Sequence, residues 1–174
     1  MTDPATYRLV VLRHAKAEPA GAGGDLGRPL ALRGRRQATA VGRALLAAGL
    51  VPAAALCSPA LRTRQTWELA SAAWGGQAPE ARWDETLYDA GPQDLLRAVN
   101  GLGAGARTGI VVGHEPAVSS LAAYLADAGS DAAALAQARV GVPTATCCVL
   151  ESAAPWSAWG RSTATLLAVV PPPA

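Results

Sequence analysis

Two arginines and two histidines stand out in this sequence because each comes shortly after an apolar run. Arg13 and His14 follow YRLVVL, Arg62 lies just beyond AAALCSP, and His114 follows GIVVG. Guanidinium groups and protonated imidazoles donate charge-assisted hydrogen bonds to phosphate oxygens. If the fold brings these four residues together, they form a pocket for a dianionic phosphoryl group.

Each of these polar residues is expected at the end of a strand or shortly after one. Apolar and β-branched runs predict buried strands at Tyr7–Leu12, Ala53–Cys57 and Ile110–Val112. Two further strands are predicted at Thr144–Leu150 and Ser162–Val170, paired as neighbours near one edge of the sheet.

Helices are predicted between these strands. Apolar residues recur with helical spacing over Arg33–Gly49, where the glycine is a plausible stop. Ser58 is expected to cap a second helix that has Pro59 as its first residue, and further helices are expected to begin near Pro92 and Pro116.

This alternation predicts an α/β fold, a three-layer α/β/α sandwich around a mostly parallel sheet, as a single domain over residues 1–174. Such sheets bind ligands in crevices beyond the carboxyl ends of their strands. Arg13, His14, Arg62 and His114 are therefore expected to face one crevice.

The composition narrows the classes of partner, cofactor and compartment that the protein can have. The formal net charge is only +2, and no run of like charge predicts binding to nucleic acid or to a membrane surface. No stretch is apolar enough to span a bilayer, and three cysteines with no metal-ligand spacing favour the reducing cytoplasm. No metal site and no organic cofactor are predicted.

Three segments carry a resemblance to a known family. LRHAKAEP, SPALRTRQT and VVGHEP resemble, in this order, the signatures of the histidine phosphatase superfamily, which has the phosphoglycerate-mutase-like fold. The short chain and the segment RPLALRGRRQA look like the single-domain phosphohistidine phosphatases of the SixA type.

The resemblance implies a role for each matched residue. His14 would be the nucleophile that forms a phosphohistidine, while Arg13, Arg62 and His114 would bind the phosphoryl oxygens. A neutral imidazole can attack phosphorus with one nitrogen while the other donates to the backbone, and His114 suits a protonated partner. The resemblance also suggests Glu85 as the acid that protonates the leaving group, with Asp84 as the weaker alternative.

The predicted function is a metal-independent phosphatase that removes phosphate from phosphohistidine on a partner protein. Two alternatives stay open: hydrolysis of a small phosphorylated metabolite, with the Gly-rich loop Pro19–Gly27 as a lid, and a phosphate-binding protein without turnover. Arg28 is expected either to close over substrate or to pair with a surface acid. The five tryptophans are expected in the core and at its edge, and the oligomeric state is not predicted.

Overall fold

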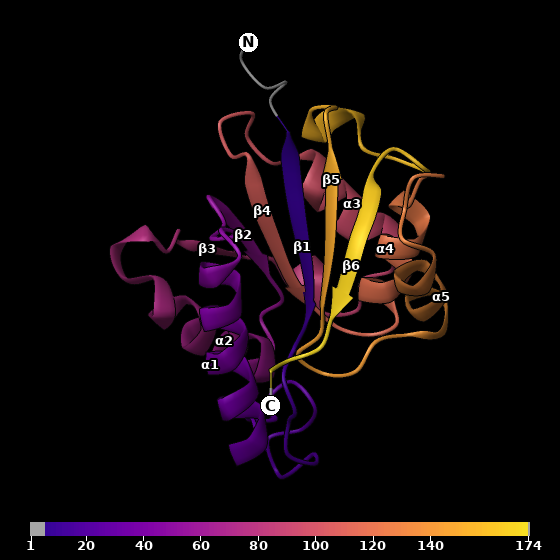
Figure 1. Ribbon diagram of the computed structural model, residues 1–174. Helices are drawn as coiled ribbons and strands as arrows, with labels where there is room; N and C mark the ends of the chain where they lie inside the picture. The colour runs from indigo at the N-terminus through magenta and orange to yellow at the C-terminus, as the bar shows by residue number, and fades with distance from the viewer. Residues whose placement is uncertain (1–5, 174) are drawn as a thin grey trace.

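The computed structural model describes residues 6–173 and has one six-stranded sheet at its centre (Figure 1). The strand order is β3-β2-β4-β1-β5-β6. Strands β1 to β4 are parallel, whereas β5 is antiparallel to β1 and to β6. The strands are β1 (Tyr7–Arg13), β2 (Ala54–Cys57), β3 (Ala81–Trp83), β4 (Thr108–Gly113), β5 (Cys147–Ser152) and β6 (Thr165–Val170).

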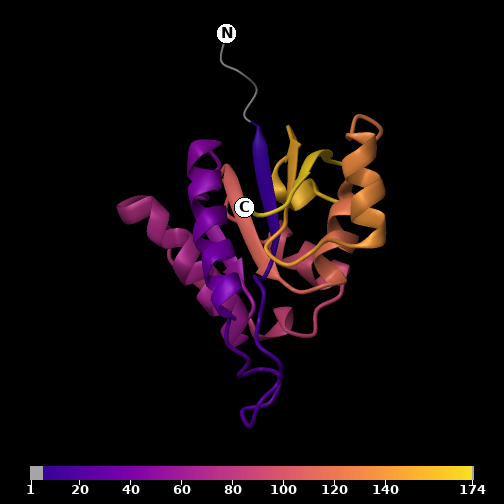
Figure 2. The same ribbon diagram turned by 60° about the horizontal axis from the view of Figure 1, so that its bottom comes forward.

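Helices cover both faces of this sheet, so the predicted three-layer α/β fold is confirmed (Figures 1 and 2). One face carries α1 (Leu32–Ala47) and α2 (Leu61–Ser71); the other carries α3 (Pro92–Asn100), α4 (Ala117–Leu125) and α5 (Ala132–Val140). Short 3-10 helices lie at η1 (Ala72–Gln77), η2 (Glu85–Leu87) and η3 (Trp156–Ala158). No helix within residues 6–173 is long and apolar enough to cross a membrane.

Strand β1 explains why the core has two halves. Leu9 and Val11 pack with the helices of one face, whereas Val10 and Leu12 pack with those of the other. All four side chains are completely buried. Successive residues of a strand point to opposite faces, so an unbroken apolar run is what a central strand with two covered faces requires.

The predicted strands and helices are found, with one wrong helix start. Ser58 and Pro59 do not begin the second helix, because α2 starts at Leu61 with Ala60 as its N-cap residue. The Ser58 side chain instead forms a hydrogen bond within the site described below. Arg62 still lies in the first helical turn, as predicted.

Two elements were not anticipated from the sequence. Strand β3 is only three residues long, and α5 consists largely of alanine, which favours helix without marking a buried stripe. Asp131 caps α5 by accepting a hydrogen bond from the Ala134 amide. Helix α5 matters for the site because the chain that follows it contacts Arg13.

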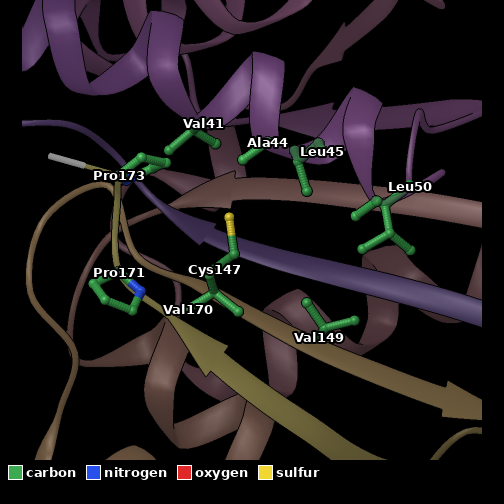
Figure 3. Close-up of a pocket in the computed structure, with 10 residues that line it drawn as sticks. Val41, Ala44, Leu45, Leu50, Cys147, Val149, Val170, Pro171 and Pro173 are labelled. Atoms are coloured by element: carbon green, nitrogen blue, oxygen red, sulfur yellow. The ribbon is translucent and has the colours of Figure 1, made fainter.

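The chain end lies against the α1 face of the sheet. After β6, Pro171 and Pro173 line a small apolar pocket together with Leu45 of α1 and Cys147 and Val149 of β5 (Figure 3). The tail does not continue the sheet, as the prolines predict. It forms instead one wall of this pocket.

Candidate active site

Three neighbouring parallel strands place the predicted site residues at one edge of the sheet. Strands β2, β4 and β1 are adjacent, and their carboxyl ends are followed by Ser58, His114 and His14 respectively. Backbone bonds continue the pairing past the strand ends, because the His14 amide donates to Gly113 and the Ser58 amide donates to Val112. The side chains that follow are therefore positioned by the sheet itself.

His14 is held in the orientation that a nucleophile needs. Its ring is nearly buried, with 8% exposure, and its Nδ1 donates to the Ala15 carbonyl at 2.8 Å. This bond places the proton on Nδ1 and leaves the lone pair on Nε2. Burial lowers the pKa of His14 to about 4, and the charges of Arg62 and Arg13 act in the same direction. The ring is therefore neutral at neutral pH and able to attack phosphorus.

His114 faces His14, with 5.2 Å between the ring centroids. Its Nδ1 lies 3.4 Å from Arg62 Nη2, and its Nε2 lies 2.7 Å from Ser58 Oγ. A guanidinium can only donate, so Nδ1 accepts and Nε2 carries the proton donated to Ser58. The ring is thus neutral here, and burial followed by the nearby His14 and Arg62 lowers the pKa of His114 to about 3. A dianion beside it would raise that pKa toward the expected protonated form.

Ser58 is a positioning residue and not the predicted helix cap. Its side chain is completely buried, and its Oγ accepts hydrogen bonds from His114 Nε2 at 2.7 Å and from the Ala60 amide at 3.4 Å. Because β2 and β4 are hydrogen-bonded neighbours, the residues that follow them meet directly. That proximity depends on strand order, which the local sequence around Ser58 does not contain.

Arg62 is the cation at the centre of the site. It is 6% exposed and lies in the first turn of α2, where helix amides also favour anions. Thr66 ties this helix to the loop after β1, since its hydroxyl accepts from the Ala15 amide and donates to the Arg62 carbonyl. Arg62 Nη1 and Nη2 both donate to Asp25, at 2.7 Å to its carbonyl and 3.0 Å to its carboxylate.

Asp25 is a site residue that sequence reasoning missed. It lies in the Gly-rich loop Pro19–Gly27, where no motif marks it, and its carboxylate also accepts bonds from Tyr88 and Arg28. These hydrogen bonds, together with the charge of Arg62, hold the pKa of Asp25 well below its usual range. An ionised carboxylate therefore sits on the guanidinium that is expected to bind phosphate. Arg28 pairs with this acid, which is the second of the two roles considered for it.

The position of Asp25 gives a first prediction. Substituting Asp25→Asn removes a negative charge that competes with phosphate for Arg62, so phosphate should bind about threefold to tenfold more tightly. The measurement is the inhibition constant of inorganic phosphate. Asp89→Asn is the matched control, because Asp89 is exposed and forms no ion pair with Arg62. Weaker phosphate binding in the Asp25 variant alone would show that Asp25 helps to hold the anion instead.

Arg13 is held by the segment that follows α5. Its Nη1 donates to the Val142 carbonyl at 2.7 Å, while the Val142 amide donates to Glu115 Oε1 at 2.9 Å. Ser119 occupies the other Glu115 oxygen at 2.6 Å. Glu115 thus orients Arg13 through Val142. The sequence offered a signal for Glu115, since it immediately follows His114, but only the fold reveals its partner.

The predicted acid Glu85 lies beside the site without joining its hydrogen-bond network. It is exposed at the start of η2, three residues before Tyr88, whose ring centroid lies 5.7 Å from that of His114. The alternative, Asp84, is occupied locally, because it accepts from Thr86 and pairs with Arg82. The role of Glu85 as a proton donor therefore stays a prediction.

Comparison with known proteins identifies the family. Residues 9–90 match the family model of the histidine phosphatase superfamily, branch 1. An uncharacterized protein of Mycobacterium tuberculosis is 41% identical over 147 residues, which are 84% of this chain and 90% of the relative. This relative extends the similarity well beyond the region that the family model matches.

Two solved structures have the same fold. A protein assigned as phosphohistidine phosphatase SixA from Nakamurella multipartitia shares 33% identity at a TM-score of 0.81, over 99% of this chain and 100% of that one. A second protein assigned as phosphohistidine phosphatase SixA, from Agrobacterium tumefaciens, shares 25% identity at a TM-score of 0.77. The match covers 95% of this chain and 98% of that one. The predicted resemblance is confirmed, and the chain belongs to the histidine phosphatase superfamily and is a phosphatase.

Proposed function

We propose that this phosphatase removes the phosphoryl group from phosphohistidine on a partner protein, without a metal, through a phosphoryl group carried by His14. The observation that carries the proposal is the geometry of His14. Its Nδ1 is fixed to the Ala15 carbonyl, its ring is neutral, and it faces His114, whose Nδ1 lies 3.4 Å from Arg62 Nη2. A neutral, oriented nucleophile beside cationic donors is what phosphoryl transfer needs.

The reaction takes two steps. In the first, the Nε2 lone pair of His14 forms a bond to phosphorus while the bond to the leaving nitrogen breaks; the leaving imidazole, which carries a proton on its other nitrogen, keeps the electron pair of that bond and departs neutral. In the second, a water oxygen attacks phosphorus, the Nε2–P bond breaks, and inorganic phosphate leaves. In both steps Arg13, Arg62 and protonated His114 bind the non-bridging oxygens, where negative charge must be stabilised.

The environment of the acids supports a phosphohistidine substrate. Asp25 is kept ionised by its hydrogen bonds and so is a poor proton donor, which leaves the exposed Glu85, outside the hydrogen-bond network of the site, as the acid for a substrate that needs one. An alkoxide leaving group needs an acid, whereas an imidazole with an unperturbed pKa of about 6.5 leaves readily once protonated.

The free, buried cysteines Cys57, Cys147 and Cys148 fit the reducing cytoplasm as the compartment of this protein.

One observation favours a second candidate, a small phosphorylated metabolite. Next to the site lies an open hollow of about 490 Å³, lined in part by Arg13, Glu115 and Arg139. Small-molecule sites commonly have volumes of about 300–1,000 Å³. The loop Pro19–Gly27, whose Asp25 already contacts Arg62, would then close over the bound metabolite.

Comparing two donors tests the proposal and the role of Glu85 together. We expect wild-type protein to hydrolyse a phosphohistidine peptide with a higher kcat/KM than phenyl phosphate. Glu85→Gln should lower phenyl phosphate hydrolysis by about 10²-fold and leave phosphohistidine hydrolysis within about threefold, because only the phenolate needs the acid.

Glu80→Gln serves as the control, since Glu80 is an exposed carboxylate in the linker before β3. If Glu85→Gln leaves phenyl phosphate hydrolysis unchanged, Glu85 is not the acid. A wild-type preference for phenyl phosphate, or for a small metabolite, would overturn the proposed substrate class. Loss of activity on treatment with a chelator would overturn the metal-free mechanism.

A further inference from the structure

Open hollows adjoin one another along the surface beside the phosphate site. The first, of about 490 Å³, is lined by Arg13, Arg139 and Pro143 among others. The second, of about 390 Å³, is lined by Lys16, Arg33 and again Pro143. Because both are lined by Pro143, they adjoin at that residue and together form a depression that includes Arg13, the neighbour of His14.

A third hollow extends this depression along α1. It measures about 330 Å³ and is lined by Arg33, Arg36 and Pro172, so it shares Arg33 and Pro172 with the second. The C-terminal prolines form the opposite wall. We call the three together the basic trough, after its cationic residues, which are Arg13, Lys16, Arg33, Arg36 and Arg139.

The charge of the basic trough is not balanced by the protein. Its one acidic residue is Glu115, both of whose oxygens are occupied by Val142 and Ser119. Lys16, Arg33, Arg36 and Arg139 are all exposed, and none forms an ion pair with a carboxylate within residues 6–173. An anionic partner would therefore meet several free cations.

The first turns of α1 make this arrangement unfavourable for the isolated protein. Arg33 lies in the first turn, where the helix dipole favours acids, and that turn contains no acid. Arg33 and Arg36 are three residues apart on one helix, so their charges also repel. A partner that supplies carboxylates would relieve both effects.

A close backbone contact fixes these cations beside the loop after β1. The Ala31 amide donates to the Lys16 carbonyl at 2.9 Å, and a Cβ added at Gly34 would lie 1.9 Å from the same oxygen. No other side chain allows α1 to approach this closely. Lys16, two residues after His14, is therefore held close to the start of α1, where Arg33 lines the same hollow.

We infer that the basic trough docks an acidic surface of the phosphoprotein substrate, next to its phosphohistidine. The inference rests on the proposed function, since a phosphohistidine side chain must enter beside Arg13 and bring its surrounding surface with it. The trough starts at that entrance and leads away from it, so it meets residues flanking the phosphohistidine. Complementary charge there raises the rate of encounter and favours one orientation.

A pair of synthetic peptides tests this inference. Both carry phosphohistidine, flanked in one by glutamates and in the other by glutamines. Wild-type protein should hydrolyse the glutamate peptide with about tenfold higher kcat/KM at low salt, and the preference should shrink as salt is added. Arg33→Glu with Arg36→Glu should abolish the preference and leave hydrolysis of the glutamine peptide within about twofold.

Arg107→Glu with Arg161→Glu is the matched control, because it changes the net charge by the same amount. Arg107 precedes β4 and Arg161 precedes β6, so both lie at the end of the sheet away from the site. This variant should keep the preference for the glutamate peptide. Equal wild-type rates on both peptides would overturn the trough inference alone, whereas hydrolysis of neither peptide would overturn the proposed function. Tighter binding of a single-stranded oligonucleotide than of the unphosphorylated acidic peptide, weakened by the α1 substitutions, would replace the proposed partner with a nucleic acid.

Discussion

Substituting His14→Ala should lower turnover of phosphohistidine peptide and phenyl phosphate by at least about 10³-fold, because the covalent step loses its nucleophile. The remaining donors still bind the phosphoryl group, so affinity for inorganic phosphate should change far less than kcat. Within residues 6–173 the ring forms one hydrogen bond, to Ala15, so the fold should persist in the variant, which circular dichroism checks.

Added imidazole provides the control for this loss. The deleted ring leaves a gap bounded by His114 and the Ala15 carbonyl, and free imidazole in it can act as the attacking nitrogen. Partial return of turnover at millimolar imidazole in the variant, with no effect on wild type, is expected. Wild-type turnover in His14→Ala without imidazole would show that the attacking group is not His14.

Substituting Arg62→Ala should have the second-largest effect, a loss of about 10²- to 10³-fold in kcat/KM, because a buried cation that contacts transferring oxygens is removed. Asp25 would also lose the guanidinium that restrains it. Arg62→Lys should recover only part of the activity, since an ammonium cannot match two oxygens at once. The measurement is steady-state kinetics with phosphohistidine peptide.

Arg64 gives a matched control on the same helix. It donates to the Pro59 carbonyl and its guanidinium lies 4.5 Å from the centre of the Trp83 ring, so it is engaged away from the histidines. Arg64→Ala should stay within about threefold of wild type. Equal losses in the Arg62 and Arg64 variants would mean that helix stability, not phosphate binding, explains the effect.

The sequence predicts those site residues that lie at or just after the ends of strands. Arg13, His14 and His114 end or follow apolar runs, and parallel strands deliver such residues to one edge whatever their exact order. The position of Arg62 in a first helical turn is predicted from the helix after β2, even though that helix begins two residues later than Pro59. Local patterns were enough because each residue is positioned by its own strand or helix.

The residues that were missed depend on contacts between distant segments. Asp25 reaches Arg62 across 37 residues, and Ser58 reaches His114 across 56. Both pairs are set by strand order and by the course of a loop, neither of which leaves a periodic signal. The basic trough was missed for the same reason, since Lys16, Arg33 and Arg139 are scattered along the chain and form no run of charge.

The tryptophans show that the burial of a side chain is easier to predict from the sequence than its contacts. Trp67, Trp74, Trp156 and Trp159 are buried in the core, as expected in a chain that lacks phenylalanine. Trp83 is half-buried at the edge and stacks with Arg64. A large apolar side chain needs only to leave water, so its burial is predictable even when its neighbours are not.

Trapping the phosphoryl enzyme tests the central claim most directly. Wild-type and His14→Ala protein are mixed with phosphohistidine peptide labelled at phosphorus, quenched rapidly in alkali, and analysed for protein-bound label and for released phosphate. The account predicts transient label on His14 in wild type, stable to alkali and lost in acid, and none in the variant. Phosphate release without labelled enzyme, or an acid-stable label, would contradict it; bound phosphate with no release would identify a phosphate-binding protein instead.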